Sequence, residues 1–520
     1  MTNMTGEQYP LLSPRRQRGF YTGGADIRRL LAKDALCYVD GTDIVIGGSR
    51  YDLGLKPGQT RMVSMGAYIL LFPDKKYINT ADPADRGSME QRFSCQQAEI
   101  APCLSDGTPI DLTDGTDPRE GDYRLAGRLE RYTAAGWMAV AGSAVRLSAP
   151  GIQTGFAAGD GVCLTGVPQV GSAAVILGVG EGYLILPGLG TAEKLGPVAV
   201  ERRLPELDFC VEAGNRLWGC RYGKNREGAF VNELYASKLG DFRNWSCFQG
   251  LSTDSYRASL GSDGVFTGAV NYLGDPLFFK EGILHRVYGS CPANFQIRSD
   301  ACQGVQRGSE DSLAIVGETL FYKSRLGVCA YNGGEPVEVS GDLGDRHYHA
   351  AVAGAHGGNY HISMADEQNQ YHLFVYDTRR RFWHREDGTR VLCFASWGSE
   401  LYFLDGADGQ IKTVFGTGSA RYQTPVRWMV QTGLWEVEDP ACKYVSLIQL
   451  RLELRLNSAV EVYLQYDSQE NWEYAGTARG TKVRTVTLPI RPRRCGHFRL
   501  MLKGRGEARL YSMTVTTAEA

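Results

Sequence analysis

The stretch Gly398-Ser-Glu-Leu-Tyr402 joins a glycine turn to the start of an apolar and aromatic strand, and five related phrases precede it. They are Gly214-Asn-Arg-Leu-Trp218, Val231-Asn-Glu-Leu-Tyr235, Gly274-Asp-Pro-Leu-Phe278, Gly317-Glu-Thr-Leu-Phe321 and Gly357-Gly-Asn-Tyr-His361. The successive spacings of 17, 43, 43, 40 and 41 residues indicate a repeat of about 40 residues. The short first spacing indicates that one repeat contains the phrase twice. Short strands that recur at ~40–50 residues are typical of the blades of a β-propeller.

The same pattern occurs near the N-terminus, in Ala35–Asp40, Asp43–Ile46 and Met65–Phe72. We therefore expect residues 20–103 to form a first part of the propeller and residues 204–420 its main part, with about six or seven blades in all. A sheet that combines N-terminal and later strands would close the ring and remove an exposed edge.

Three further regions differ from this pattern. Residues 1–19 predict an extended N-terminal arm, and residues 104–203 predict a small inserted β-barrel that follows an acidic, turn-rich connector. Residues 421–520 alternate apolar and polar side chains at period two, as in KYVSLIQLRLELRL from Lys443 to Leu456, which predicts a C-terminal β-sandwich.

The composition supports an all-β chain with many tight turns. Glycine accounts for 64 of the 520 residues, and the best helical window, Asp26–Ala35, is short. The formal net charge of −2 indicates no global attraction to polyanions. Thirteen cysteines without a C-x2-C pair argue against a zinc ribbon. We expect no signal peptide and no membrane insertion, because no apolar run approaches the ~20 residues of a membrane span.

The sequence contains no recognisable catalytic or cofactor motif. G-x-S-x-G, G-x-x-x-x-G-K-[ST], H-E-x-x-H and a strand-to-helix G-x-G-x-x-G are all absent. We therefore predict that the protein is not an enzyme, with no cofactor and no metal. Paired carboxylates of a glycosidase have no fixed spacing, so that class stays open.

Two clusters could nevertheless bind metals. His347-Tyr-His349 would place two imidazoles on one face of a strand. Asp111, Asp114 and Asp117 offer hard oxygen ligands but lack the glutamate that ends an EF-hand loop. We interpret both clusters as ordinary strand, loop and linker residues.

The C-terminal region holds the strongest local charge. Residues 479–509 include ten basic residues and a single acidic residue, Glu507. We select a candidate patch that faces a partner or DNA, made of Arg484, Arg491, Arg493, Arg494, Arg499, Lys503 and Arg505. The alternative is a solvated sheet face. No aromatic ladder interleaves these arginines, which disfavours stacking of single strands.

A second basic cluster lies in the N-terminal arm. We predict Arg15, Arg16 and Arg18 to be a candidate docking arm, because such arms usually become ordered only on a neighbour.

The segment Val231-Asn-Glu-Leu-Tyr-Ala-Ser-Lys-Leu-Gly-Asp-Phe-Arg-Asn-Trp245 resembles propeller-bearing structural proteins of tailed bacteriophages, including tail nozzle (tail tubular protein B-like) and packaged-DNA-stabilisation proteins. Tyr9–Arg15, Ser64–Thr80 and Pro489–Cys495 are similar to virion proteins of phages of gut Firmicutes. No catalytic residue carries over, because the resembled proteins are structural. The resemblance implies a virion component made in the cytoplasm of the bacterial host.

We accordingly expect a non-enzymatic adapter or nozzle component of the head–tail junction or tail. It would form a homo-oligomeric ring, contact portal, adaptor or tail proteins, and touch phage DNA without sequence specificity. The alternative is a propeller that binds or cleaves host-surface carbohydrate. A cellular scaffold with kelch-like blades is a third reading, disfavoured because paired glycines occur irregularly.

Overall fold

A computed structural model describes residues 1–416, 420–421, 425–436, 443–480, 482–488 and 493–518. Throughout these residues the chain is all-β, with two single-turn 3-10 helices, η1 (Glu310–Ser312) and η2 (Gly341–Leu343), and no α-helix. The chain divides into two compact units: residues 1–52 with 302–520, and residues 53–301.

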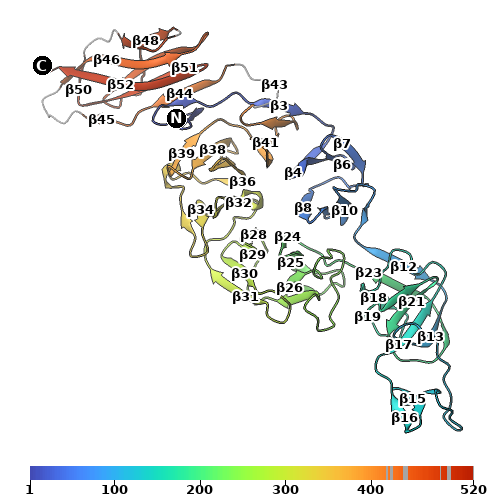
Figure 1. Cartoon of the computed structure of the whole chain (residues 1–520). Coiled ribbons are helices and arrows are strands. Elements are labelled where there is room, and N and C mark those ends of the chain that lie inside the picture. The colour runs from blue at the N-terminus through green and yellow to red at the C-terminus, as the bar shows by residue number, and fades with distance from the viewer. Residues whose placement is uncertain (417–419, 422–424, 437–442, 481, 489–492, 519–520) are drawn as a thin grey trace. The chain divides into compact units, whose positions relative to one another are not determined.

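Among the described residues, six antiparallel sheets each contain four strands in sequence order (Figure 1). In the unit of residues 53–301 the three such sheets are β8 (Arg61–Met65), β9 (Tyr68–Phe72), β10 (Lys76–Asn79) and β11 (Arg86–Ser88); β24 (Phe209–Ala213), β25 (Arg216–Lys224), β26 (Phe230–Ala236) and β27 (Tyr256–Ser259); and β28 (Gly268–Tyr272), β29 (Asp275–Lys280), β30 (Ile283–Tyr288) and β31 (Gln296–Ala301).

The other unit contains three sheets of the same kind. They are β4 (Ile27–Lys33), β5 (Ala35–Asp40), β6 (Asp43–Ile46) and β7 (Ser49–Asp52); β32 (Ala314–Val316), β33 (Thr319–Lys323), β34 (Val328–Tyr331) and β35 (Val337–Glu338); and β36 (His349–His356), β37 (Asn359–Ala365), β38 (Tyr371–Asp377) and β39 (Phe382–Arg385). The short helical window at Asp26–Ala35 is therefore mostly strand β4.

A further sheet of this unit joins distant parts of the sequence. It contains β40 (Val391–Trp397), β41 (Glu400–Asp405) and β42 (Ile411–Thr413), and β3 (Gly19–Thr22) from the N-terminal region pairs antiparallel with β42. The short β43 (Ala420–Arg421) pairs with β3 in turn. An N-terminal strand thus completes a late sheet, as the sequence predicted.

The repeated phrases fall at equivalent places in these sheets. Gly214, Gly274, Gly317, Gly357 and Gly398 each lie between the first and second strand of a sheet and have φ of +61°, +94°, +63°, +59° and +59°. Glycine suits these turns because it adopts positive φ without a steric penalty. The phrase at Val231 belongs to β26, in the same sheet as the phrase at Gly214. One sheet therefore contains the phrase twice, as the short spacing indicated.

Neighbouring sheets of each unit bury shared apolar cores. Phe321 of β33 packs with Tyr360 of β37, and Leu30 of β4 belongs to one cluster with Leu404 of β41. In the unit of residues 53–301, Trp218 of β25 lies in one cluster with Phe278 of β29. Since a four-stranded sheet exposes two faces, this stacking removes the apolar face of each sheet from water.

Residues 91–202 form a separate module within the unit of residues 53–301. One sheet contains β12 (Gln91–Cys95), β23 (Val198–Arg202), β18 (Gly161–Thr165) and β19 (Ala173–Val175); a second contains β20 (Gly178–Gly180), β21 (Tyr183–Pro187), β17 (Ser143–Ser148), β13 (Ala98–Leu104) and β22 (Glu193–Leu195). Both contribute to one core, which includes Val145, Val162 and Leu184.

This module begins earlier than the boundary expected at residue 104, because β12 and β13 pair with its later strands. Its strands form two sheets around a core, and the closed barrel that we expected stays a prediction. A third small sheet, β14 (Tyr123–Leu125), β15 (Leu129–Thr133) and β16 (Gly136–Ala139), lies at the tip of the module beyond β13 and β17 (Figure 1).

The C-terminal region forms two antiparallel sheets around one core, as in a β-sandwich. The first contains β44 (Arg427–Gln431), β51 (His497–Arg505), β47 (Ala459–Tyr466) and β48 (Glu473–Arg479), with β45 (Trp435–Glu436) also paired to β51. The second contains β49 (Arg484–Leu488), β46 (Lys443–Leu454), β50 (Arg493–Cys495) and β52 (Ala508–Ala518). Val462 and Leu450 from opposite sheets are fully buried in this core.

The N-terminal arm packs onto its own unit. Its strands β1 (Met4–Thr5) and β2 (Ser13–Pro14) pair as a hairpin, and Met4 is buried in the core of the C-terminal sandwich. Leu12 forms an isolated bridge with Leu510 of β52. The arm is therefore folded back between sheets of its own chain instead of extended.

Candidate functional site

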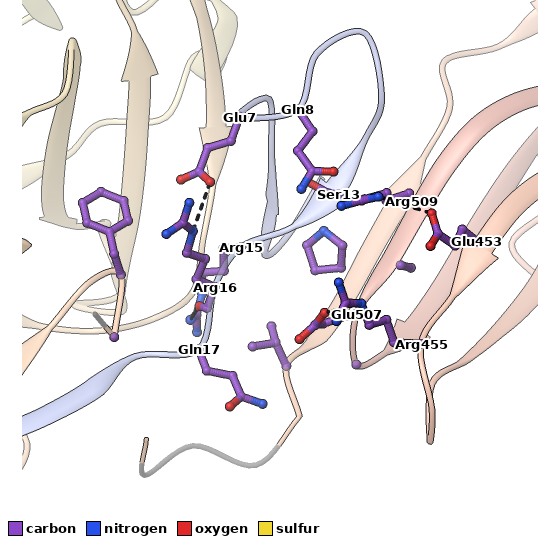
Figure 2. Close-up of a pocket in the computed structure, with 16 residues that line it drawn as sticks. Glu7, Gln8, Ser13, Arg15, Arg16, Gln17, Glu453, Arg455, Glu507 and Arg509 are labelled. Carbon is purple, nitrogen blue, oxygen red and sulfur yellow. Dashed lines mark hydrogen bonds and ion pairs between the residues drawn. The ribbon is translucent and has the colours of Figure 1, made fainter. Parts of the chain in front are cut away.

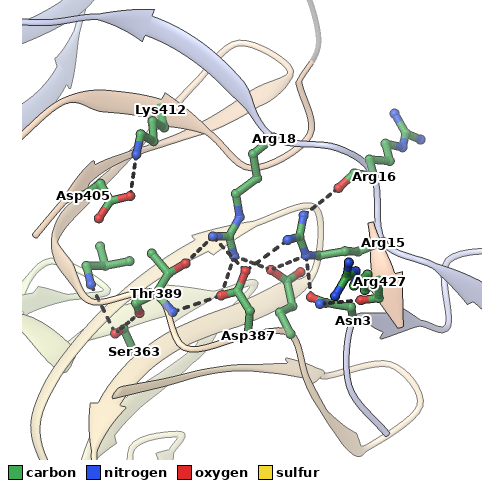
Figure 3. Close-up of polar contacts among 12 residues, drawn as sticks. Asn3, Arg15, Arg16, Arg18, Ser363, Asp387, Thr389, Asp405, Lys412 and Arg427 are labelled. Carbon is green, nitrogen blue, oxygen red and sulfur yellow. Dashed lines mark hydrogen bonds and ion pairs between the residues drawn. The ribbon is translucent and has the colours of Figure 1, made fainter. Parts of the chain in front are cut away.

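The arm is held by a buried network of ion pairs (Figure 3). Arg18 is 1% exposed, and its Nη2 donates to Glu386 Oε2 at 3.0 Å and to Asp387 Oδ1 at 3.1 Å. Arg15 Nη2 donates to Asp387 Oδ2 at 3.0 Å, and Arg15 Nε donates to Asn3 Oδ1 at 2.8 Å. The sequence marks both arginines, but their partners lie about 370 residues away and only the fold brings them together.

The charges in this network are well compensated. Burial alone would raise the pKa of Glu386, but the guanidinium groups of Arg18 and Arg15 outweigh burial and hold that pKa below its usual value. The same balance lowers the pKa of Asp387. Two carboxylates therefore stay ionised against two arginines, and the site has no spare charge for a partner.

Only one arginine of the predicted docking arm faces solvent. The side chain of Arg16 is 61% exposed, and its Nε lies 3.4 Å from Glu7 Oε2. Arg15 and Arg18 fasten the arm to its own chain and cannot reach a neighbour while the arm is in place. The order of this arm comes from contacts within the chain.

Two buried histidines lie beneath the arm. His361 of β37 and His384 of β39 line a small cavity together with Arg15 and Glu386. Burial lowers the pKa of His361 to about 4, and burial also lowers the pKa of His384. Neither ring nitrogen of His361 has a hydrogen-bond partner among the described residues. These imidazoles are neutral and packed at neutral pH.

The two clusters that could have bound metals have ordinary surroundings in the described structure. His347 is exposed before β36, and the Nε2 of His349 lies 3.2 Å from Asn369 Oδ1. In the acidic connector, Asp114 accepts a hydrogen bond from the backbone N–H of Thr116 at 2.9 Å. Within the described part of the chain, no three His, Cys, Asp or Glu side chains are grouped as a metal site would require.

A cavity of about 610 Å³ lies between the arm and the C-terminal sandwich (Figure 2). Its charged lining consists largely of arginine–glutamate pairs. Arg455 Nε is 3.1 Å from Glu507 Oε2, and Arg509 Nη1 is 3.4 Å from Glu453 Oε2. Each carboxylate of this lining therefore has an arginine beside it.

The basic patch predicted at the C-terminus is distributed over both sheets of the sandwich. Arg499, Lys503 and Arg505 lie on β51 of one sheet, whereas Arg484 begins β49 of the other. Arg493 and Arg494 are placed by backbone only, in β50, and Arg491 lies outside the described residues. The described members of the predicted patch therefore lie on two different sheets.

The fold adds Arg427, which lies outside the basic run, and Arg479, which begins that run but was not selected for the patch. Cross-strand register places Arg427 of β44 directly opposite Arg505, and it places Arg479 of β48 opposite Ala459, the other neighbour of Arg505. Arg427, Arg505 and Arg479 are all exposed. The sequence signal that could have grouped them is alternation. All three stand at odd-numbered positions, in strands whose buried residues are mostly even-numbered.

No family model and no curated protein matches the chain. Solved structures with some likeness include the computationally designed Ika8 protein, 10% identical, with a TM-score of 0.33 over 76% of this chain and 99% of that one. The β-propeller domain of the Trilobed protease from Pyrococcus furiosus is 9% identical, with a TM-score of 0.27 over 77% and 98%.

An exo-β-1,3-galactanase from Phanerochaete chrysosporium is 10% identical, with a TM-score of 0.22 over 58% of this chain and 95% of that one. At these TM-scores the likenesses carry no inference about activity. Within the described residues, no helix is long and apolar enough to cross a membrane.

Proposed function

We propose that this protein is a non-enzymatic structural component of a tailed-phage virion, an adapter or nozzle piece of the head–tail junction or tail. It works through protein–protein contacts in a homo-oligomeric ring. The partners are portal, adaptor or tail proteins, and the place of action is the virion. The resemblance of Val231–Trp245 to phage structural proteins motivates the virion assignment.

The scaffold that we infer for this role is a β-propeller of seven blades. Six sheets of four consecutive strands, and a seventh that β3 completes, have the composition that such blades need. The apolar clusters shared between neighbouring sheets support stacking of this kind. A stacked all-β scaffold is rigid, which suits a protein that holds other proteins at fixed positions.

One observation carries the non-enzymatic part of the proposal. The acidic side chains in the cavity beside the arm, and those of the buried network, face arginines. A site that cleaves glycosides with the usual pair of carboxyl groups needs an acid whose pKa is raised by its surroundings. Glu386 and Asp387 have lowered pKa values instead, because of Arg18 and Arg15.

The oligomeric state of the purified full-length chain tests this proposal. Light scattering after size exclusion, with negative-stain images of the same fractions, should reveal a closed ring of several copies. A protein that stays monomeric at tens of micromolar and is missing from purified virions would overturn the adapter role. Release of reducing sugars from host-surface glycans would favour the glycan-cleaving alternative.

A further inference from the structure

The outer face of the sheet β44–β51–β47–β48 can be mapped row by row from its register. Along β51, Phe498, Leu500, Leu502 and Gly504 point into the sandwich, so the residues between them lie on the outer face. The first row across the four strands is Arg427, Arg505, Ala459 and Arg479.

This row brings like charges together. Arg427 and Arg505 are direct cross-strand neighbours, and Ala459 alone separates Arg505 from Arg479. Like charges in opposite positions destabilise an antiparallel pair. No acidic residue occupies this row, so the sheet presents three exposed guanidinium groups that attract an anion.

The next two rows add a lysine and two aromatic rings. Lys503 neighbours Met429 and Glu461, and its Nζ lies 4.9 Å from the ring centroid of Tyr463. Tyr463 and Tyr474 are paired across β47 and β48, with ring centroids 5.7 Å apart, and Tyr474 is 60% exposed. Met501 is buried on this face beside Tyr463.

The whole outer face carries more basic than acidic groups. In the three rows above and in the next row, where Arg499 lies opposite Gln465, one side chain, that of Glu461, is acidic and five are basic: Arg427, Arg479, Arg499, Lys503 and Arg505. Glu461 accepts a hydrogen bond from the hydroxyl of Tyr463 at 2.8 Å. The net charge of the face is therefore strongly positive, unlike that of the chain as a whole, which is −2.

We propose that this face, the outer face of β44–β51–β47–β48, binds single-stranded nucleic acid without sequence preference. Arg427, Arg505 and Arg479 contact phosphates, and the exposed ring of Tyr474 stacks on a base. Proteins that bind single strands combine a basic track with such stacking surfaces.

The position of the rings favours a nucleic acid over an acidic peptide. Met501, in the row of Tyr463 and Tyr474, lies four residue steps along β51 from Arg505, so the backbones of the two rows are about 13 Å apart. Three strand steps from Arg427 to Arg479 span about 14 Å. A surface of this size accommodates a few nucleotides, and carboxylates of a peptide would leave the rings unused. The inference does not depend on assembly into a ring.

Fluorescence anisotropy with a labelled 20-nucleotide oligo-dT tests the proposal on the full-length chain. The R427Q/R479Q/R505Q variant should bind at least tenfold more weakly in 50 mM salt. The slope of log K against log salt should become shallower by about 2, because each phosphate contact to a single strand contributes about 0.7. Tyr474→Ala should weaken oligo-dT about tenfold and should leave the salt slope unchanged.

A matched control removes the same charge elsewhere. Arg92, Lys194 and Arg298 are exposed residues of the other unit, and changing all three to Gln should leave binding within twofold. Equal weakening by this control would overturn the site. So would absence of oligo-dT binding by the wild-type chain, or competition by poly-glutamate as effective as that by unlabelled oligo-dT, which would identify an acidic protein surface as the occupant. None of these outcomes affects the oligomeric state, which tests the adapter role separately.

Discussion

The N-terminal arm and the outer face of the C-terminal sandwich use arginine in opposite ways. Arg15 and Arg18 are buried against Glu386 and Asp387, whereas Arg505 is exposed and lies opposite another arginine. Both regions are runs of basic residues in the sequence, and neither run reveals which use applies. The difference teaches that the counter-charge, supplied by distant parts of the fold, decides whether an arginine fastens the chain or faces a partner.

The largest effect should come from breaking the buried network. Arg18→Met leaves Glu386 ionised and buried with one partner fewer, and removing one member of a buried pair costs about 3–5 kcal/mol. Urea unfolding followed by tryptophan fluorescence should show that loss in the transition of the unit that contains the arm.

Arg16→Met is the matched control, because the side chain of Arg16 is largely exposed and should change stability by less than about 0.5 kcal/mol. The double variant Arg18→Met/Glu386→Leu should recover much of the loss, since it also removes the uncompensated carboxylate. Equal stability of Arg18→Met and Arg16→Met would contradict the fastening role.

Acid should weaken the arm through the histidines beneath it. The pKa of His361 is about 4 in the fold and near 6.5 when exposed, so protons bind the unfolded chain first as pH falls. The free energy of unfolding should decline between pH 6.5 and 4, by about 3 kcal/mol from this group. Glu386 and Asp387, with lowered pKa values, begin to lose their contribution near the ordinary carboxyl pKa of about 4 and lose the rest at lower pH.

His361→Leu should flatten this decline, and urea midpoints at half-unit steps of pH measure it. His285, buried in the other unit with its pKa also lowered to about 4 by burial, supplies an internal reference, since His361→Leu should not alter its contribution. If the urea midpoint of His361→Leu fell with pH as steeply as that of the wild type, His361 would not be the cause of the acid sensitivity.

A smaller effect is expected behind the basic face. A Cβ on Gly504 would lie 2.0 Å from the indole of Trp428, which is 5% exposed, so Gly504→Ala must displace that ring. Overpacking of a core usually costs about 1–3 kcal/mol. Thermal unfolding of the sandwich should shift down, whereas Gly496→Ala, whose nearest neighbour atom would be 3.7 Å away, should change little.

The smallest effect distinguishes the two regions by its sign. Arg505→Gln relieves the like-charge contact with Arg427, so stability should stay the same or rise by a few tenths of a kcal/mol at low salt. The gain should fade in high salt because exposed charges are screened. If Arg505→Gln instead destabilised the sandwich as Arg18→Met destabilises the arm, Arg505 would stabilise the fold as Arg18 does, and the contrast between the two regions would be wrong.

Local patterns in the sequence predicted the strands well where glycine turns set them. Gly317 and Gly357 have positive φ, and a short run rich in apolar and aromatic residues follows each of them, so both signals are local. Asp26–Ala35 was ambiguous, because the pattern of apolar residues in IRRLLAK is compatible with a helix as well as with a strand. Pairing with β5 makes this segment a strand. The start of the inserted module was misplaced because β12 and β13 find their partners about 50 to 100 residues later.

The candidate sites were harder to predict for the same reason. The linear cluster from Arg484 to Arg505 crosses a sheet boundary, so its members separate in space. Arg427 joins Arg505 across 78 positions of sequence through antiparallel register, which no local pattern encodes. The sequence analysis disfavoured stacking of a single strand because no aromatic residues interleave the basic run. Tyr463 and Tyr474 lie outside that run and reach the same face only in the folded sheet.

The pairing of β3 with β42 also constrains how the chain folds during synthesis. Residues 19–22 leave the ribosome early, yet their partners at 411–413 are made roughly 390 residues later. At about 5–20 residues per second, the first segment waits about 20–80 s for its sheet. Until then these residues are open to proteases and to other nascent copies, so a ribosome-bound chain should be vulnerable at a segment that the finished protein pairs into a sheet.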